Sequence, residues 1–156
     1  MFITGINPTA TSATREFALG TIGTAVTSGV QKCYKYVQYE TAAGAVAAVS
    51  GNVCYYYAPS GTSAGSYTIV TSDLSDSAGV GAGVLQSAPA DGEYCWIQIK
   101  GPATLTPALT AGADGNALTP IGSTDGALDV SALVTDHICA YAIDASAKIV
   151  LCDFPW

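Results

Sequence analysis

Charged side chains are scarce in this 156-residue chain, where Asp, Glu, Lys and Arg make up 11% of the residues against about a quarter in an ordinary soluble domain. Only five of them are cations, and the net charge is −7. The chain therefore lacks the basic surface that neutralises phosphates, and we expect neither nucleic acid nor an anionic membrane as a partner. No apolar run is long enough for a membrane helix, and no basic segment followed by an apolar one marks a secretion signal.

Residues that form metal or nucleophilic sites are also few. The only histidine is His137, which with Cys139 offers two ligands where a zinc site needs four, and the five cysteines contain no Cys-x-x-Cys pair. Each cysteine lies in an apolar run, so we interpret all five as reduced structural thiols. No Gly-x-Ser-x-Gly elbow is present. We therefore expect no catalytic residue, no metal and no cofactor, and the protein is not predicted to be an enzyme.

Two further patterns resemble functional motifs only superficially. The glycine run Ala78–Gly83 lacks the Gly-Lys-Ser/Thr ending of a phosphate loop, so it predicts a flexible or bulged strand. Acidic pairs such as Asp73 with Asp76 and Asp91 with Glu93 lie in turns, where a carboxylate caps the local backbone. These acids are therefore predicted to stabilise loops.

What the sequence does contain is a series of short strand patterns separated by turn residues. The runs are rich in Val, Ile, Thr and Tyr and are bounded by Gly, Pro, Asp, Asn and Ser, which is typical of a β-sandwich or barrel. We predict a mainly β fold: a single compact β-barrel or β-sandwich-like domain with an extended N-terminal arm and little helix. The expected strands are Ala18–Ile22, Lys32–Glu40, Val53–Ala58, Tyr67–Thr71, Ala82–Gln86, Glu93–Lys100, Ala103–Leu105, Thr135–Ala142 and Lys148–Asp153.

Local patterns refine this prediction. Asp91-Gly92 between two strand runs predicts a hairpin, because this pair tolerates positive φ. Both faces of Glu93–Lys100 carry apolar groups, so this strand is expected to be central and covered on both sides. The segment Glu40–Val49 has a weak helical pattern that Gly44 interrupts, and residues 101–136 are expected to be a mostly irregular excursion with short strands.

The first 17 residues lack any periodicity, so we divide the chain into an extended arm, 1–17, and a single β domain, 18–156. The arm contains Phe2, Ile3 and Phe17, which are unfavourable in water. Two interpretations remain open: the segment lies as a strand on the protein's own core, or it docks on a neighbouring subunit. A docking arm could be removed with almost no change in the thermal transition of the domain.

One succession of motifs resembles a known family. A glycine-rich strand over Gly83–Gln86, an acidic turn at Asp91-Gly92 and the stretch Tyr94–Ala103, which reads YCWIQIKGPA, follow one another. With the Tyr-rich strand before them and the final Phe-Pro-Trp, they resemble the small capsid decoration, or cement, proteins of tailed bacteriophages over about two thirds of the chain. The resemblance implies a β-barrel, commonly trimeric, that binds outside the capsid at junctions between capsomers and requires no cofactor.

From this resemblance we expect a structural virion protein on the outer capsid surface, assembled in the host cytoplasm. Its expected partners are the major capsid protein and itself, as a homotrimer. A tail-tube subunit, a head-fibre base and an extracellular carbohydrate-binding or adhesion domain remain alternatives. Large apolar groups near both chain ends are the candidate capsid or subunit contacts: Phe2, Ile3, Ile6, Phe17, Phe154 and Trp156.

Overall fold

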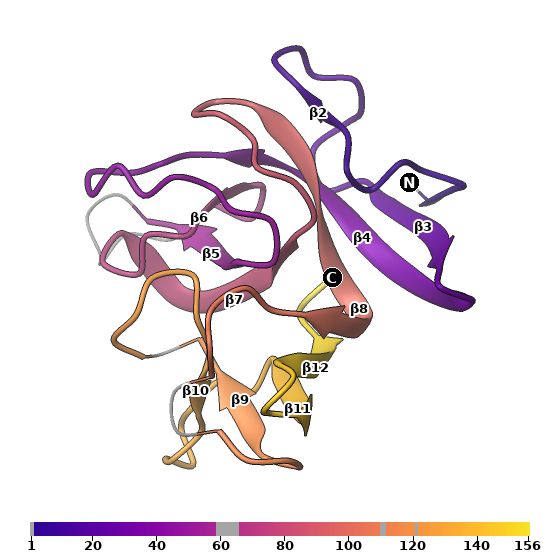
Figure 1. The fold of residues 1–156 in the computed structure, drawn as a ribbon. Coiled ribbons are helices and arrows are strands. Elements are labelled where there is room, and N and C mark those ends of the chain that lie inside the picture. The colour runs from indigo at the N-terminus through magenta and orange to yellow at the C-terminus, as the bar shows by residue number, and fades with distance from the viewer. Residues whose placement is uncertain (1, 59–65, 110–111, 121) are drawn as a thin grey trace.

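The computed structural model describes residues 2–58, 66–109, 112–120 and 122–156, and within these ranges it contains strands and turns but no helix (Figure 1). The predicted mainly β domain is confirmed, and the segment 40–49 forms turns. The strands are β1 Phe2–Thr4, β2 Thr11–Ser12, β3 Ile22–Thr27, β4 Val30–Tyr39, β5 Val53–Tyr57, β6 Ile69–Thr71, β7 Ser77–Leu85, β8 Tyr94–Thr104, β9 Ala117–Thr119, β10 Asp129–Val130, β11 Ala140–Asp144 and β12 Ile149–Asp153.

Five strands close into a barrel in the order β4-β6-β5-β7-β8, and β8 completes the circle by pairing with β4. The β4–β6 pair is parallel and the other four pairs are antiparallel. The glycines of β7 permit a close approach to β8, since a Cβ on Gly83 would lie 2.8 Å from the backbone oxygen of Gln98. The pairing of β5 with β7 shifts register twice, so the run Ala78–Gly83 is part of a bulged strand, as predicted.

The strand β8 belongs to two layers of the molecule. Its first half pairs with β4 in the barrel, and its second half pairs with β12, which leads to β11, β9 and β10 (Figure 1). These last strands form a C-terminal sheet against one side of the barrel. The predicted hairpin at Asp91-Gly92 joins β7 to β8, with Gly92 at φ 77°.

The structure gives no evidence for a separate N-terminal arm. Strand β1 pairs in parallel with β3, and β2 pairs antiparallel with β8. Both partners belong to the same chain, so residues 2–17 follow the first of the two interpretations above. The segment lies on the outer face of β4 and β8, where it covers a group of aromatic side chains.

Several strand boundaries differ from the prediction. Strand β7 begins at Ser77 and not at Ala82, and the strands expected at Glu93–Lys100 and Ala103–Leu105 form the single strand β8. The strand expected at Ala18–Ile22 is Ile22–Thr27, and a tight turn at Ser28-Gly29, both with positive φ, joins it to β4. The strand expected from Thr135 begins at Ala140, because the Asp136 carboxylate accepts hydrogen bonds from the N–H groups of Ala132 and Leu133 and closes a turn there. Residues 101–136 are expected to be mostly irregular with short strands, but residues 101–104 belong to the long strand β8. The described part of residues 105–136 contains only the short strands β9 and β10.

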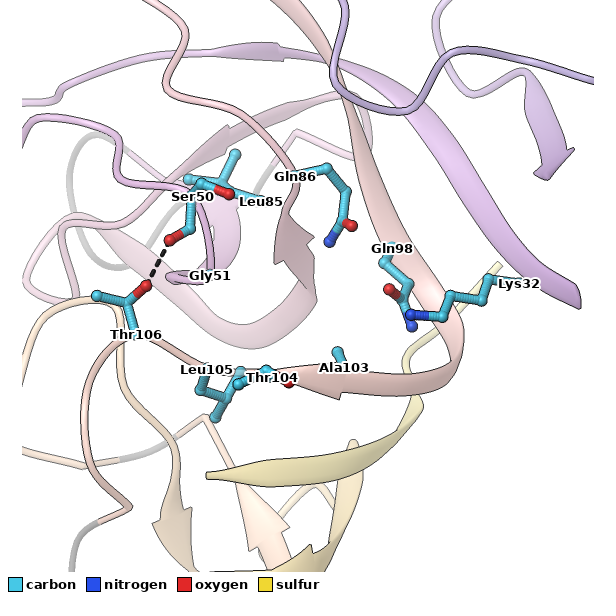
Figure 2. A pocket seen from close by; sticks show the side chains of 10 residues that line it. All are labelled: Lys32, Ser50, Gly51, Leu85, Gln86, Gln98, Ala103, Thr104, Leu105 and Thr106. Carbon is cyan, nitrogen blue, oxygen red and sulfur yellow. Dashed lines mark hydrogen bonds between the residues drawn. The ribbon is translucent and has the colours of Figure 1, made fainter. Parts of the chain in front are cut away.

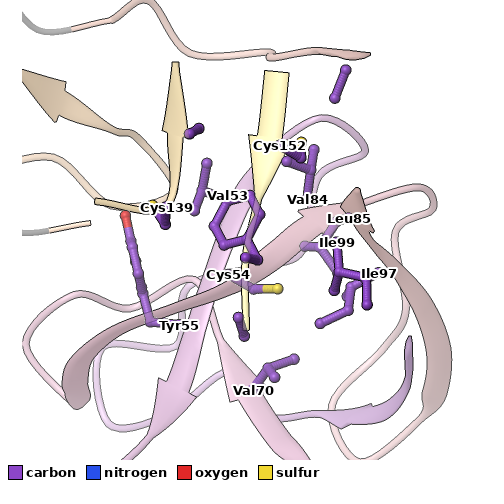
Figure 3. Packing of buried hydrophobic residues seen from close by; sticks show 14 of the residues in the cluster. Val53, Cys54, Tyr55, Val70, Val84, Leu85, Ile97, Ile99, Cys139 and Cys152 are labelled. Atoms are coloured by element: carbon purple, nitrogen blue, oxygen red, sulfur yellow. The ribbon is translucent and has the colours of Figure 1, made fainter. Parts of the chain in front are cut away.

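The buried side chains form two clusters. The larger fills the barrel and the space beneath the C-terminal sheet, and Figure 3 shows part of it, including Cys54, Tyr55 and Ile97. The smaller consists of Tyr34, Tyr36 and Trp96 on the outer face of β4 and β8. Because β8 contributes Trp96 to one cluster and Ile97 to the other, the expectation of a central strand covered on both faces is confirmed.

Four of the five cysteines are buried, and Cys33 is half-buried; all five have free thiols. Burial raises the pKa of Cys95 and of Cys152 to about 12, so little reactive thiolate forms near neutral pH. We therefore expect brief alkylation of the native protein at pH 8 to modify Cys33 alone, and alkylation after denaturation without reductant to modify all five. Mass spectrometry of both samples measures this, with Cys33→Ser as the control that abolishes native labelling. A denatured count of three would reveal a disulfide.

Candidate functional site

The residues that could perform metal chemistry are dispersed. Within the described part of the chain, no three His, Cys, Asp or Glu side chains are placed to hold a metal ion. His137 is half-buried and its Nδ1 has no hydrogen-bond partner, whereas Cys139 is buried in the larger core. The two residues, which the sequence places on one face of a predicted strand, precede β11 and differ in burial.

Three aspartates hold the loop that follows β4. The carboxylate of Asp91 accepts hydrogen bonds from the N–H and hydroxyl of Thr41, and these bonds hold the pKa of Asp91 below its ordinary value. The loop also donates from Ala43 N–H to Asp76 at 2.8 Å and from Gly44 N–H to Asp73 at 2.9 Å. The predicted role of turn aspartates as backbone caps is confirmed at these positions.

Of the six candidate contact residues, Ile6 and Phe17 pack against the smaller core, and Ile3 lies beside them. The ring centroid of Phe17 is 5.4 Å from that of Trp96 and 5.2 Å from that of Tyr36. Ile3 and Ile6 line a shallow pocket together with Phe17 and Trp96. These apolar groups are therefore half-buried on the chain's own aromatic cluster.

The other three candidates lie near the chain ends and differ sharply in exposure. Phe154 is fully buried in the larger core, so it is not part of the surface in the free chain. Phe2 is 75% exposed and Trp156 is 59% exposed. Their rings contact each other edge to face, with centroids 6.2 Å apart. The two ends of the described chain thus meet in one exposed aromatic pair.

A mostly apolar cavity of about 320 Å³ lies beside this pair, where β5 ends and β7 begins. We call it the barrel-end pocket. Its walls combine aromatic rings with small aliphatic groups, and Tyr67 at its rim is 76% exposed. The lining residues are Tyr56, Ser66, Tyr67, Ala78, Val80, Pro155 and Trp156.

Lys35 is the unusual residue of this region, because it is only 5% exposed. It alternates along β4 with Tyr34 and Tyr36 and shares the face of Val37, which points into the larger core. Its Nζ donates a hydrogen bond to the Tyr56 hydroxyl at 2.8 Å. Burial lowers the pKa of Lys35 and raises that of Tyr56 to about 12. The ion pair found among the described residues is Lys100 with Asp153, so Lys35 has no carboxylate partner there.

A second cavity, of about 280 Å³, is polar and is shown in Figure 2. Gln86, Gln98 and Lys32 line one side of it, and the Thr106 hydroxyl donates to the Ser50 carbonyl on another. The Gln98 Nε2 donates to the three carbonyls of residues 100–102, at 3.3, 3.0 and 2.9 Å. Gln98 therefore holds the bend in β8 at Gly101, where φ is 95°.

The C-terminal sheet exposes large apolar side chains on its outer face. Tyr141, Ile143 and Leu151 are 44%, 49% and 44% exposed. Tyr141 pairs with Leu151, and Leu151 pairs with Pro102, so Tyr141, Leu151 and Pro102 form a row across β11, β12 and β8. We call Tyr141, Ile143, Leu151 and Pro102 the outer sheet face.

Sequence reasoning missed the outer sheet face. The signal was present in Ala140–Asp144, where large and small apolar residues alternate, but the structure buries Ala140 and Ala142 and exposes the larger side chains between them. A pattern with the small residues inside is the reverse of what burial energy favours in a monomer.

No described helix could span a membrane. Comparisons with protein-family models, with curated proteins and with solved structures found no match to this chain.

Proposed function

We propose that this chain is a structural virion protein that binds the outer surface of a bacteriophage head and stabilises contacts between major capsid subunits. The sequence resemblance to decoration proteins suggests this role. The single structural observation that supports it is the outer sheet face, where Tyr141, Ile143 and Leu151 are exposed on paired strands.

The outer sheet face suits protein contact for two reasons. Tyr141, Leu151 and Pro102 are held by backbone pairing, so little conformational freedom is lost when a partner covers them. Its rim carries the Lys100–Asp153 ion pair, which leaves no unpaired charge from these two residues to be desolvated. Contiguous apolar surface with a polar rim is typical of protein–protein interfaces.

In this proposal the protein acts as a homotrimer, added to the head in the host cytoplasm. Threefold repetition multiplies one modest contact into stable attachment. The proposed partners are the major capsid protein and further copies of the chain; neither nucleic acid nor membrane is proposed. Cryo-electron microscopy of purified virions tests this directly, since the barrel should occupy density outside the shell. Density inside a tail tube, or none on the virion, would overturn it.

A charge placed on the outer sheet face should prevent attachment. We expect Leu151→Glu to weaken binding to undecorated shells at least tenfold, because the carboxylate would be desolvated without a partner, while an exposed substitution changes folding stability by only about 0.5 kcal/mol. Cosedimentation with shells measures the binding. Val134→Glu, at a fully exposed loop position, is the control. If Leu151→Glu binds like the wild type, this face is not the attachment surface.

A further inference from the structure

A lysine buried without a carboxylate partner is unfavourable, since an ammonium loses its hydration and gains little in return. Lys35 has three N–H donors, and the structure gives it one hydrogen bond among the described residues, to Tyr56. An apolar residue in its place would avoid this penalty. The position therefore needs an explanation beyond packing.

Tyr56 links Lys35 to the barrel-end pocket. Tyr56 is itself 5% exposed and lines this cavity, while its hydroxyl accepts the hydrogen bond from Lys35. Since burial keeps the phenol protonated, the hydroxyl also retains one O–H to donate. Tyr56 thus connects a buried cation to a cavity whose remaining walls are mainly hydrocarbon and aromatic.

Strand register places two apolar residues in one row with Lys35 across the sheet. Phe2, Ile22 and Lys35 form one row across β1, β3 and β4, so their side chains share a face. Phe2 in turn contacts Trp156, which lines the cavity. This row therefore connects the strand position of Lys35 with the apolar wall of the barrel-end pocket.

We propose that the barrel-end pocket binds a small apolar monocarboxylate, with its carboxylate at the Tyr56 hydroxyl in front of the Lys35 ammonium and its hydrocarbon part against Val80, Tyr67 and Trp156. The cavity volume of about 320 Å³ is at the lower end of the range for small-ligand sites. A single cation matches one negative charge, and the apolar walls exclude heavily hydrated polyanions. This assignment is independent of the capsid role proposed above.

Charge explains why the ligand should be an acid. A neutral apolar ligand would contact the apolar walls and leave the Lys35 ammonium without a negatively charged partner. A carboxylate would make the same apolar contacts and also supply that negative charge. Hydrogen bonds to charged groups contribute roughly 1.5–3 kcal/mol. An acid should consequently bind about tenfold or more tightly than its uncharged amide.

Hexanoate and hexanamide are suitable probes, because they share a hydrocarbon chain and differ in charge. Titration of the intact protein, followed by calorimetry or by NMR shifts, should give at least tenfold tighter binding of hexanoate. In Lys35→Met this preference should fall to less than twofold, because the cation is gone and the apolar volume remains. Lys32→Met, on the same strand outside the barrel-end pocket, is the matched control and should keep the preference.

Tyr56→Phe provides a second variant, which keeps the ring and removes only the hydroxyl. It should also lose the preference for the acid, and it decides the question if Lys35→Met does not fold. Equal binding of the two probes by the wild-type protein, binding of neither, or a preference that survives in both variants would overturn the assignment. If the protein did not bind capsid shells, the assignment of the barrel-end pocket would still stand, so the two proposals are tested separately.

Discussion

Phe154→Ala is expected to lower the free energy of unfolding by about 3–5 kcal/mol, the usual cost of truncating a fully buried phenylalanine. Phe154 is fully buried, and its N–H donates to the Ile99 carbonyl at 3.1 Å. The ring fills space that β7 leaves open at Gly81, where a Cβ would lie 2.8 Å from the Phe154 Cε1 atom. Because the glycine cannot fill the space, truncation should leave a cavity.

Chemical denaturation at equilibrium measures this loss, which corresponds to a fall of about 6–20 °C in the melting temperature. Trp156→Ala is the matched control two residues away. Trp156 is 59% exposed, so we expect its removal to change stability by less than about 1 kcal/mol. Similar losses in both variants would contradict the different environments of the two rings.

These two residues show which structural features can be predicted from the sequence and which cannot. Phe154 and Trp156 are both large apolar groups in a terminal Phe-Pro-Trp, and nothing local distinguishes them. Their environments are decided by the non-local pairing of β12 with β8, which carries Phe154 over Gly81. By contrast, Asp91-Gly92 encodes its hairpin through its own φ preferences, and that hairpin was predictable.

The barrel-end pocket was beyond sequence reasoning for a related physical reason. The run Lys32–Tyr39 carries apolar groups on both faces, so alternation alone could not tell which face of β4 enters the barrel. Once β4 closes on β8, Lys35 lies on the face of Val37 and Tyr39. Lys35 thus becomes a candidate site residue only when the barrel is known.

The N-terminal segment, for which the sequence left two interpretations open, packs on the chain's own domain. A docking arm could be lost without consequence for the domain, but the structure places Ile6 and Phe17 on the cluster of Tyr36 and Trp96. The fit is close: a Cβ on Gly23 would lie 2.9 Å from atoms of both Ile6 and Trp96. This segment therefore acts as part of the domain, and it covers the indole of Trp96, which is only 2% exposed.

Deletion of residues 2–14 should accordingly reduce the free energy of unfolding by about 1.5–3 kcal/mol, since it removes the half-buried Ile3 and Ile6 and uncovers Trp96, and full burial of one such side chain contributes roughly 1.5–3 kcal/mol. Tryptophan emission should shift to longer wavelength as Trp96 meets water, while exposed Trp156 adds little to the change. Thr9→Ala, an exposed substitution within the same segment, is the control and should leave both measurements unchanged. A truncated protein with full stability and unshifted emission would restore the docking-arm interpretation, because only a segment that contributes nothing to the core can be removed without either effect.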